Sequence, residues 1–534
     1  MLLYAIIFIS GGAILALELL ASRIMTPYFG VSLYIWTGIL SITLVSLALG
    51  YWLGGRLAAK AEDGRLIQLY VAMPALAAIA IVAACLVYPH AFAGFANSSL
   101  VLGAFAACLV LLFLPLVATS AMNPLLVAIL LRRRHDAGAG AGDAGSGKVF
   151  FVSTLGSVAG VFVTAFGLIP YVSNFTATLI VALVLALLSL AAVFFSPAPV
   201  PNKGAVGAFA VVGLILAGSL LWQADAYTGR QGPYVYGGAT WRLEASYSSL
   251  FGTVKVLRTT AEPDSGRFLR MYFQDGLNQN TADSGNRSTS FYTYALEGLA
   301  RAYRPQMHGA LVLGQGAGMV PMRLGELGVP VEVVDVDPVA KTVASRFFGF
   351  DSRMIVTHEA DARTFLRRCE ANYDIIVVDL FNGDGTPDYL VTREFFHDLR
   401  TCLAGGGVAV FNTFADLKAP ASYAHFLVTL KSELPHLALY RPHVPGATHV
   451  NSFVVASAQP LPAPAKVTFD YVPQRHQEGL WNMLSSPLPL TPDYFAGGRV
   501  VTDAANVVAH DYARMQVVYR KSVVEGIPPA MLLN

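Results

Sequence analysis

Long apolar stretches dominate the first 224 residues of the chain. Each of them reaches the length of about 20 residues that an α-helix needs to cross a bilayer. There are seven such stretches, near residues 2–25, 33–59, 66–88, 99–131, 149–170, 173–195 and 205–223. The pattern predicts an α-helical transmembrane bundle of about seven spans in residues 1–224.

Two of these stretches differ from a plain spanning helix. The first is long and has no basic residue before its apolar core, so we expect it to be retained and not cleaved as a signal peptide. The fourth is overlong and contains Pro115 and the pair Asn123-Pro124. Because proline removes a backbone hydrogen bond and clashes with the preceding turn, we expect this segment to be kinked or broken.

From residue 225 onward the pattern changes to short strands, helical periods and dispersed charge. Residues 225–300 predict a linker and a small β-domain of two to four strands, with turns at Gly252 and at Asp275-Gly276. In residues 301–534 strands alternate with helices, which predicts a parallel, doubly wound, Rossmann-like sheet. The expected strands are 309–314, 331–337, 354–362, 373–379, 405–414 and 452–457.

The composition agrees with this division into a membrane part and a soluble part. Of the 534 residues, 55% are hydrophobic and only 13% are charged, whereas soluble domains carry about 25% charge. This excludes a disordered chain and an ordinary cytosolic enzyme. The net charge of +2 gives no reason to expect a nucleic-acid partner. The four cysteines form no CxxC, and their spacing suits neither a zinc site nor a disulfide framework, so we expect four small buried residues.

The first candidate chemistry follows the first strand of the Rossmann-like part. Gly314, Gly316 and Gly318 allow a tight turn and the close approach of a ligand to backbone N–H groups at a helix start. Asp335 ends the second strand, 21 residues after Gly314. A carboxylate at that place accepts hydrogen bonds from the ribose hydroxyls of an adenosine.

Carboxylates also follow the third and fourth strands. Asp361 and Ala362 are placed to read an adenine amino group, and Asp379 ends the fourth strand. Because ligands bind at the carboxyl ends of parallel strands, these residues predict one adenosine site. NAD and S-adenosylmethionine are both compatible with the glycine loop and these strand-end residues. Position 319 is Met and breaks the usual dinucleotide glycine pattern, and Asp379 suits amine chemistry, so we favour an S-adenosyl ligand.

With these residues in view, residues 240–510 resemble the spermidine synthase family of aminopropyltransferases. The whole chain resembles the membrane-anchored, multi-spanning branch of that family, with residues 18–38 and the double glycine at 54–55 similar to its first two helices. The motifs that carry the resemblance are EASY (244–247), QDGLNQ (274–279), VVDVDP (333–338), EADA (359–362), YDIIVVD (373–379) and LVTREFF (390–396).

The resemblance implies a seven-stranded catalytic fold with a small N-terminal β-domain and no metal. It implies transfer of an aminopropyl group from decarboxylated S-adenosylmethionine to an amine such as putrescine, with release of methylthioadenosine. Asp379 would orient the amine and take its proton, and Gln279 would contact the donor. Tyr247, Tyr292 and Asn382 would contact the acceptor. Soluble family members are commonly dimers, which implies a homo-oligomer.

The sequence departs from the family at positions that hold charged amines. Ala317 stands where the glycine loop usually carries an acid, and Asn382 replaces the second acid of the catalytic loop. The family's usual Tyr-His-Glu after the β-domain is replaced near Phe291-Tyr292-Thr293-Tyr294. Three hypotheses therefore stay open. The chain is an aminopropyltransferase with an altered acceptor, another S-adenosylmethionine-dependent enzyme such as a methyltransferase or lyase, or a transporter or sensor that binds an adenosyl ligand without turnover.

The sequence gives two opposed indications of orientation in the membrane. S-adenosyl donors are made and kept in the cytosol, so we expect a multi-pass cell-membrane protein whose catalytic domain faces the cytoplasm. The positive-inside count disagrees. Basic residues cluster after the second, fourth and sixth apolar stretches, which would place the soluble half outside if all seven cross.

Overall fold

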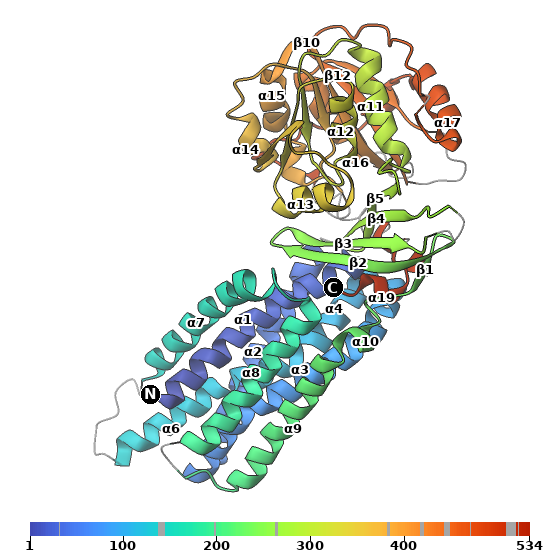
Figure 1. Cartoon of the computed structure of the whole chain (residues 1–534). Helices are drawn as coiled ribbons and strands as arrows, with labels where there is room; N and C mark the ends of the chain where they lie inside the picture. Colours follow the sequence, from blue (N-terminus) through green and yellow to red (C-terminus); the bar gives the residue numbers. More distant parts are fainter. Residues whose placement is uncertain are drawn as a thin grey trace. The chain divides into compact units, whose positions relative to one another are not determined.

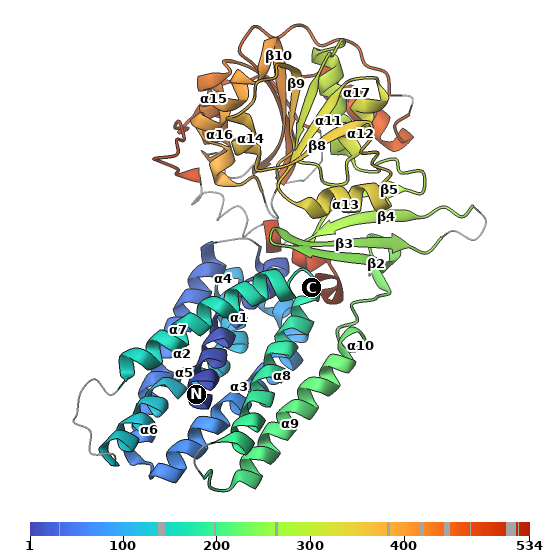
Figure 2. The same cartoon turned by 60° about the vertical axis from the view of Figure 1, so that its left-hand side comes forward.

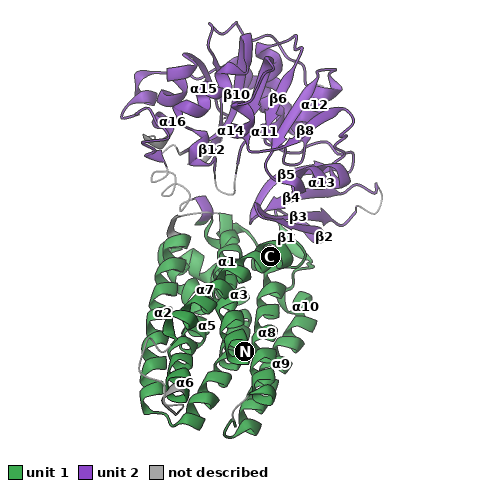
Figure 3. Ribbon diagram, turned by 90° about the vertical axis from the view of Figure 1, so that its left-hand side faces the viewer, with its two compact units in different colours: residues 1–236, 521–534 green, residues 237–520 purple. Residues whose placement is uncertain are grey.

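A computed structural model describes the chain except for residues 31–32, 137–144, 197–198, 262–264, 382–384, 417–420, 443–448, 470, 509–518 and 522. The chain forms two compact units (Figure 3). Unit 1 comprises residues 1–236 and 521–534, and unit 2 comprises residues 237–520.

Unit 1 is helical (Figure 1). Among the described residues, seven helical stretches are long and apolar enough to cross a membrane, as the sequence predicted. The helices are α1 (Leu2–Phe29), α2 (Leu33–Lys60), α3 (Asp63–Ser98), α4 (Leu100–Cys108), α5 (Leu114–Ser120), α6 (Met122–Asp136), α7 (Ser146–Phe162), α8 (Asn174–Phe195), α9 (Lys203–Trp222), α10 (Ala224–Thr228) and α19 (Pro529–Leu532).

The fourth apolar stretch has the irregularity that its prolines predicted. A π-helical segment, η1 (Leu109–Phe113), joins α4 to α5, directly before Pro115. A turn at Ala121 separates α5 from α6. Because a proline leaves the preceding turn without a donor, the helix shifts its hydrogen bonding there.

Glycines bring α1 and α7 into close contact. A Cβ at Gly160 would collide with the carbonyl of Gly12, and one at Gly156 would collide with that of Phe8. Small residues that let two backbones approach are a common basis of helix packing in membranes.

Unit 2 begins with antiparallel strands β2 (Ala239–Ser249), β3 (Gly252–Thr259), β4 (Leu269–Gln274) and β5 (Leu277–Asp283). Asp275 and Gly276 connect β4 to β5 with φ values of 46° and 86°. Two successive positive φ values define the tight hairpin that an Asp-Gly pair favours. This hairpin fixes the position of the residues at the start of β5.

The rest of unit 2 contains a seven-stranded sheet of order β11-β12-β10-β9-β6-β7-β8. Its strands are β6 (Ala310–Leu313), β7 (Val331–Asp335), β8 (Ile355–Glu359), β9 (Tyr373–Val378), β10 (Leu403–Asp416), β11 (His436–Tyr440) and β12 (His449–Ser457). The sheet is parallel as predicted except at β12, which runs antiparallel to both β10 and β11. Strand β11 was not among the predicted strands.

Alternate residues of the central strands face two separate cores. Val312 and Val377 pack with helices α11 (Phe291–Tyr303), α12 (Met319–Glu326) and α17 (Gln474–Ser485). Leu313 and Val378 pack with α14 (Ala362–Leu366), α15 (Arg393–Thr401) and α16 (Ala421–Glu433). The two helix layers cover opposite faces of the sheet (Figure 2). Since both faces are buried, the strands read as continuous apolar runs.

The cysteines differ from the expectation. Cys369 and Cys402 form a disulfide with their Cα atoms 5.9 Å apart, so the expectation that none of the four is paired is wrong. Cys369 follows α14 and Cys402 precedes β10, and the fold brings these ends together across 33 residues. Cys85 and Cys108 are buried and free.

Candidate functional site

A cavity of about 310 Å³ opens in unit 2 at the carboxyl ends of the parallel strands. Its lining includes most of the candidate residues from the sequence. These are Gln279, Tyr292, Gly314, Gly316, Asp335, Asp361, Ala362 and Asp379. Such an edge is where ligands bind in doubly wound sheets.

The glycine loop between β6 and α12 forms one wall of the cavity. Gly314, Gly316 and Gly318 have φ values of 94°, 49° and 77°, which L side chains rarely adopt. A Cβ at Gly314 would collide with the carbonyl of Asp379, and one at Gly318 would lie 2.6 Å from the Phe350 ring. Gly318 precedes α12 and is not among the residues that line the cavity.

Asp335 lies at the end of β7 and is held by the glycine loop. Its Oδ2 accepts a hydrogen bond of 2.8 Å from the backbone N–H of Gln315, and its Oδ1 accepts one of 2.9 Å from that of Asp337. Burial raises the pKa of Asp335, and these backbone donors oppose the rise. The carboxylate is therefore fixed in orientation and still lines the cavity.

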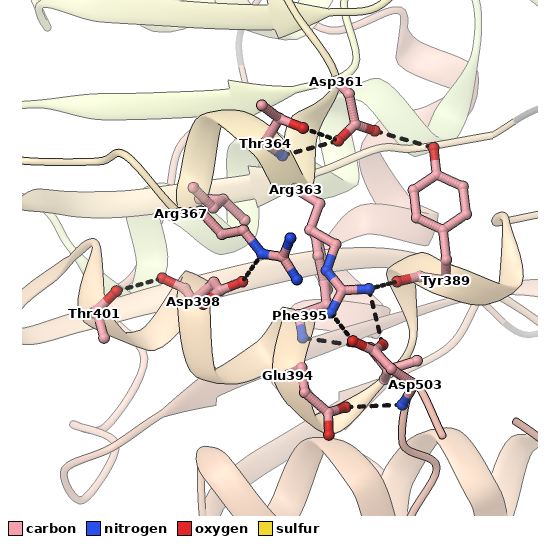
Figure 4. A network of polar contacts seen from close by, with 12 residues as sticks. Asp361, Arg363, Thr364, Arg367, Tyr389, Glu394, Phe395, Asp398, Thr401 and Asp503 are labelled. Carbon is pink, nitrogen blue, oxygen red and sulfur yellow. Dashed lines mark hydrogen bonds and ion pairs between the residues drawn. The ribbon is translucent and has the colours of Figure 1, made fainter. Parts of the chain in front are cut away.

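Asp361 caps helix α14 and also meets the cavity. Its Oδ1 accepts from the Thr364 N–H at 2.8 Å and from the Thr364 hydroxyl at 3.0 Å. Its Oδ2 accepts from the Tyr389 hydroxyl at 3.1 Å (Figure 4). Tyr389 lines the cavity as well. A helix cap and a ligand contact are compatible, because a carboxylate has about four acceptor sites.

Asp379 lies at the end of β9 and accepts a hydrogen bond from the first of two linked side-chain amides that the sequence did not reveal. Asn412 Nδ2 donates to Asp379 Oδ1 at 2.8 Å, and Asn451 Nδ2 donates to Asn412 Oδ1 at 3.0 Å. Burial raises the pKa of Asp379 to about 6, while the bond from Asn412 lowers it. A carboxylate with that pKa is mostly ionised near neutral pH and can still accept a proton.

Tyr292 lines the same cavity as Asp379. Its hydroxyl donates to the carbonyl of Gln279 at 3.0 Å and accepts from Asn280 Nδ2 at 3.3 Å. Burial, and then the charge of Asp379, raise the pKa of Tyr292. The phenol is therefore neutral and fixes Gln279 at the cavity wall.

Besides Gly318, one further described candidate, Tyr247, does not line this cavity. Tyr247 lies on β2, where its hydroxyl accepts from the Arg346 guanidinium at 3.1 Å. Asn382 lies outside the described residues. The structure adds Asp337, Asn412 and Asn451 to the lining. The described residues contain no cluster of three or more His, Cys, Asp or Glu that could hold a metal ion.

A network of polar contacts borders the cavity near Asp361 and Tyr389 (Figure 4). Arg363 on α14 forms an ion pair with Asp503 and donates to the carbonyl of Tyr389 at 3.3 Å. The backbone N–H of Asp503 donates to Glu394 at 3.1 Å. We call Arg363, Tyr389 and Asp503 the Arg363 network. It ties the segment around residue 503 to the backbone of a cavity residue.

The comparison with known protein families agrees with this geometry. Residues 289–460 match the model of the spermine/spermidine synthase domain. The matched residues are similar to that family, and they contain the glycine loop, the three strand-end aspartates, Asn412 and Asn451.

Individual relatives match the same region. A polyamine aminopropyltransferase from Vibrio vulnificus is 36% identical over 136 residues, which are 24% of this chain and 44% of the relative. An N-terminal histidine N-methyltransferase from Emericella nidulans is 34% identical over 137 residues, 25% of this chain and 24% of the relative. The chain thus spans less than half the length of these curated relatives. A probable spermidine synthase structure from Corynebacterium glutamicum covers 48% of this chain and 96% of its own, with 17% identity and a TM-score of 0.39.

Proposed function

We propose that this chain is a membrane-bound transferase of the spermidine synthase type. It moves the aminopropyl group of decarboxylated S-adenosylmethionine, or the carboxyl-bearing arm if S-adenosylmethionine itself is the co-substrate, to an amine acceptor and releases methylthioadenosine. The observation that carries the proposal is the common cavity of Asp335, Asp361 and Asp379 within the residues that match the spermine/spermidine synthase domain. Four carboxylates in the lining, counting Asp337, suit a cationic sulfonium donor.

The donor's adenosine would occupy the end of the cavity near β7 and β8. Asp335 would accept the ribose hydroxyls, with Gly314 and Gly316 close to the sugar. Asp361 and Ala362 would contact the adenine, under the ring of Tyr389. Gln279 would contact the donor from the β-domain side.

Asp379 would act on the acceptor amine. An ammonium has no lone pair, so the amine must lose a proton before its nitrogen attacks the carbon beside the sulfonium. The new N–C bond forms as the C–S bond breaks, and sulfur keeps the electron pair and becomes a neutral thioether. Asp379 takes the proton, and alignment of the two substrates supplies much of the acceleration. Tyr292 would contact the acceptor. The family resemblance implies acceptor contacts for Tyr247 and Asn382 as well.

A second candidate is another S-adenosylmethionine-dependent reaction, such as methyl transfer. Two observations favour it. Ala317 stands in the glycine loop where the family usually has an acid, and one relative is named as a histidine N-methyltransferase. The same adenosine contacts would serve this reaction, with methyl as the transferred group.

The seven long apolar helical stretches support attachment to a membrane as a multi-pass protein. We place the catalytic domain on the cytoplasmic side, because S-adenosyl donors are made there. The acceptor is a small amine of the putrescine type, and a homo-oligomer is the assembly that the family implies.

The test uses the full chain, purified in detergent, with each S-adenosyl donor and a panel of amines that includes putrescine. We expect methylthioadenosine and an alkylated amine by mass spectrometry. The Asp379→Asn variant, incubated in parallel, should form neither. S-adenosylhomocysteine as the product would instead support the second candidate, and ligand binding without any product would refute both enzymes.

A further inference from the structure

The side chain of Gln315 is buried at the cavity and lacks a hydrogen-bond partner. Gln315 is 5% exposed and lines the cavity. Among the described residues, neither its Oε1 nor its Nε2 has a partner. Because a buried amide without a hydrogen-bond partner destabilises the folded chain, such a group in a cavity points to a role in binding a polar ligand.

Both backbone polar groups of Gln315 already form hydrogen bonds, so only its side-chain carboxamide is left to bind a ligand. Its N–H donates to Asp335, the proposed ribose contact, and its carbonyl accepts from the Gly318 N–H at 2.8 Å. The backbone of Gln315 is thus anchored between Asp335 and Gly318, the residue that precedes α12. The donor's aminopropyl arm would extend into this part of the cavity.

The same loop lacks the charge that a lone ammonium needs. Ala317, also 5% exposed and in the cavity lining, stands where the family usually has a carboxylate. Its neighbours in the lining are Met319, Val320 and Pro321, which carry no charge. Within the glycine loop an ammonium would meet only the oxygen of Gln315, since the carboxylates of the lining belong to other segments, and the two N–H donors of the carboxamide would stay unpaired.

An α-amino carboxylate satisfies both ends of the carboxamide. Its ammonium donates to Oε1 and its carboxylate accepts from Nε2. The lining residues that the structure describes include no Lys, Arg or His, so the carboxylate would rely on Nε2 and on N–H groups at the start of α12. The first N–H groups of a helix have no intrahelical partner and favour an anion.

We propose that the donor of this chain keeps its α-carboxylate, so that the cavity selects unmodified S-adenosylmethionine over the decarboxylated form. Gln315 is the residue that determines this specificity, and Ala317 permits it by removing a charge that would repel the carboxylate. The inference rests on the proposed function and specifies its donor.

The transferred group is then 3-amino-3-carboxypropyl. The acceptor nitrogen forms the bond to the carbon beside the sulfonium, the C–S bond breaks, and its electrons leave with methylthioadenosine. The proton of the amine passes to Asp379. The product carries a complete amino-acid end on the acceptor nitrogen.

Calorimetric binding to the full chain tests the inference with three ligands: S-adenosylmethionine, its decarboxylated form and methylthioadenosine, which lacks the arm. We expect S-adenosylmethionine to bind the unchanged protein at least about tenfold more tightly than the decarboxylated form, which corresponds to one charge-assisted hydrogen bond. Gln315→Met, similar in size but without the amide, should abolish the preference. Ala317→Asp should reverse it.

Methylthioadenosine is the control in every variant, because its affinity reports the adenosine contacts and the folded state. It should bind equally to the unchanged protein, Gln315→Met and Ala317→Asp. If it binds while the decarboxylated donor equals or exceeds S-adenosylmethionine in the unchanged protein, the donor assignment is overturned and the proposed function stands. If none of the three ligands binds the unchanged protein, the proposed function fails with it.

Discussion

At the scale of single residues, the proposed reaction depends on the pKa of Asp379, on which two effects act in opposite directions. Burial favours the neutral acid, and the amide of Asn412 favours the carboxylate. Asn451 orients that amide by donating to its oxygen. The three side chains belong to β9, β10 and β12, which are neighbours in the sheet. The balance of these effects sets the pH range in which Asp379 can act as a base.

Replacing Asp379 by Asn should separate activity from stability. Turnover should fall by about two to four orders of magnitude, the range for losing a positioned base. The melting temperature at pH 7 should rise, because the folded-state pKa of about 6 lies above that of an unfolded Asp, and ionising this buried group opposes folding. Calorimetric melting and product formation measure the two effects. A variant that keeps full activity would assign the base elsewhere.

The same carboxylate predicts a pH profile. Because the base must be ionised, kcat/KM should fall as the pH drops below about 6, the pKa of Asp379. Asn412→Leu removes the hydrogen bond that lowers this pKa, so the acidic limb should move to higher pH, and activity should recover in alkaline buffer. Asn451→Ala should move the limb less. An unchanged limb in Asn412→Leu would contradict the role of the amide.

Asp335→Ala should weaken binding of adenosyl ligands by at least about tenfold, the loss expected for hydrogen bonds to a charged group. Calorimetry with methylthioadenosine measures it. Glu359→Ala is the matched control, because Glu359 is an exposed carboxylate at the end of β8 and does not line the cavity. Equal affinities in the two variants would refute the ribose role.

The sequence was sufficient to find the aspartates but not their partners. Asp335, Asp361 and Asp379 follow recognisable strands, and parallel strands end at one edge. Asn412 and Asn451 also lie in strand segments, but their role depends on β10 lying between β9 and β12. Local patterns do not define strand order. Gln315 could not be recognised as a candidate from the sequence, because it stands between two glycines and only its burial in the folded chain distinguishes it from a loop residue.

At the scale of elements, the Arg363 network connects distant segments of unit 2 (Figure 4). Arg363 is 9% exposed, so its charge needs a close partner. Asp503 supplies it, and the Asn506 side chain donates to the carbonyl of Asp388 at 3.0 Å. Residues 503 and 506 therefore hold the short helix η3 (Asp388–Leu390), which carries Tyr389 at the cavity.

Asp503→Ala should weaken binding of methylthioadenosine several-fold and lower the melting temperature, because it leaves the Arg363 guanidinium without its carboxylate. Asp398→Ala is the control, a neighbouring aspartate outside the Arg363 network (Figure 4). Asp398 pairs with the more exposed Arg367 at 3.4 Å and does not contact Tyr389 in the described structure. Both changes should lower stability, but only Asp503→Ala should alter ligand affinity. An equal effect on affinity would mean that the network has no specific link to the cavity.

The elements themselves were largely predictable, with informative exceptions. Long apolar helices and buried strands have strong periodic patterns, and Pro115 indicated the irregular fourth stretch. The direction of β12 and the presence of β11 were not predictable, because a short apolar run such as His436–Tyr440 has no feature that specifies its neighbours. The disulfide between Cys369 and Cys402 depends on a contact made only in the folded chain.

At the scale of the whole molecule, two arguments lead to opposite orientations of the chain in the membrane. The connections after the second, fourth and sixth apolar stretches are flanked by basic residues, namely Arg56, Lys60, Arg65, Arg132, Arg133, Arg134, Lys148 and Lys203. If every stretch crosses, the positive-inside rule puts the catalytic domain outside. The disulfide agrees, since the cytoplasm keeps most thiols reduced. The need for a cytosolic donor is the argument for the opposite side.

We expect the donor requirement to prevail, with residue 534 and the catalytic domain in the cytoplasm. A reporter fused after Asn534 that is active only in the cytoplasm should then give a signal, and protease added outside intact cells should leave the domain whole. Cys369 and Cys402 should react as free thiols in cells lysed with a trapping reagent, because that compartment is reducing. A silent reporter together with an intact disulfide would place the domain outside. The charge count would then be decisive, and the S-adenosyl donor would have to be supplied across the membrane.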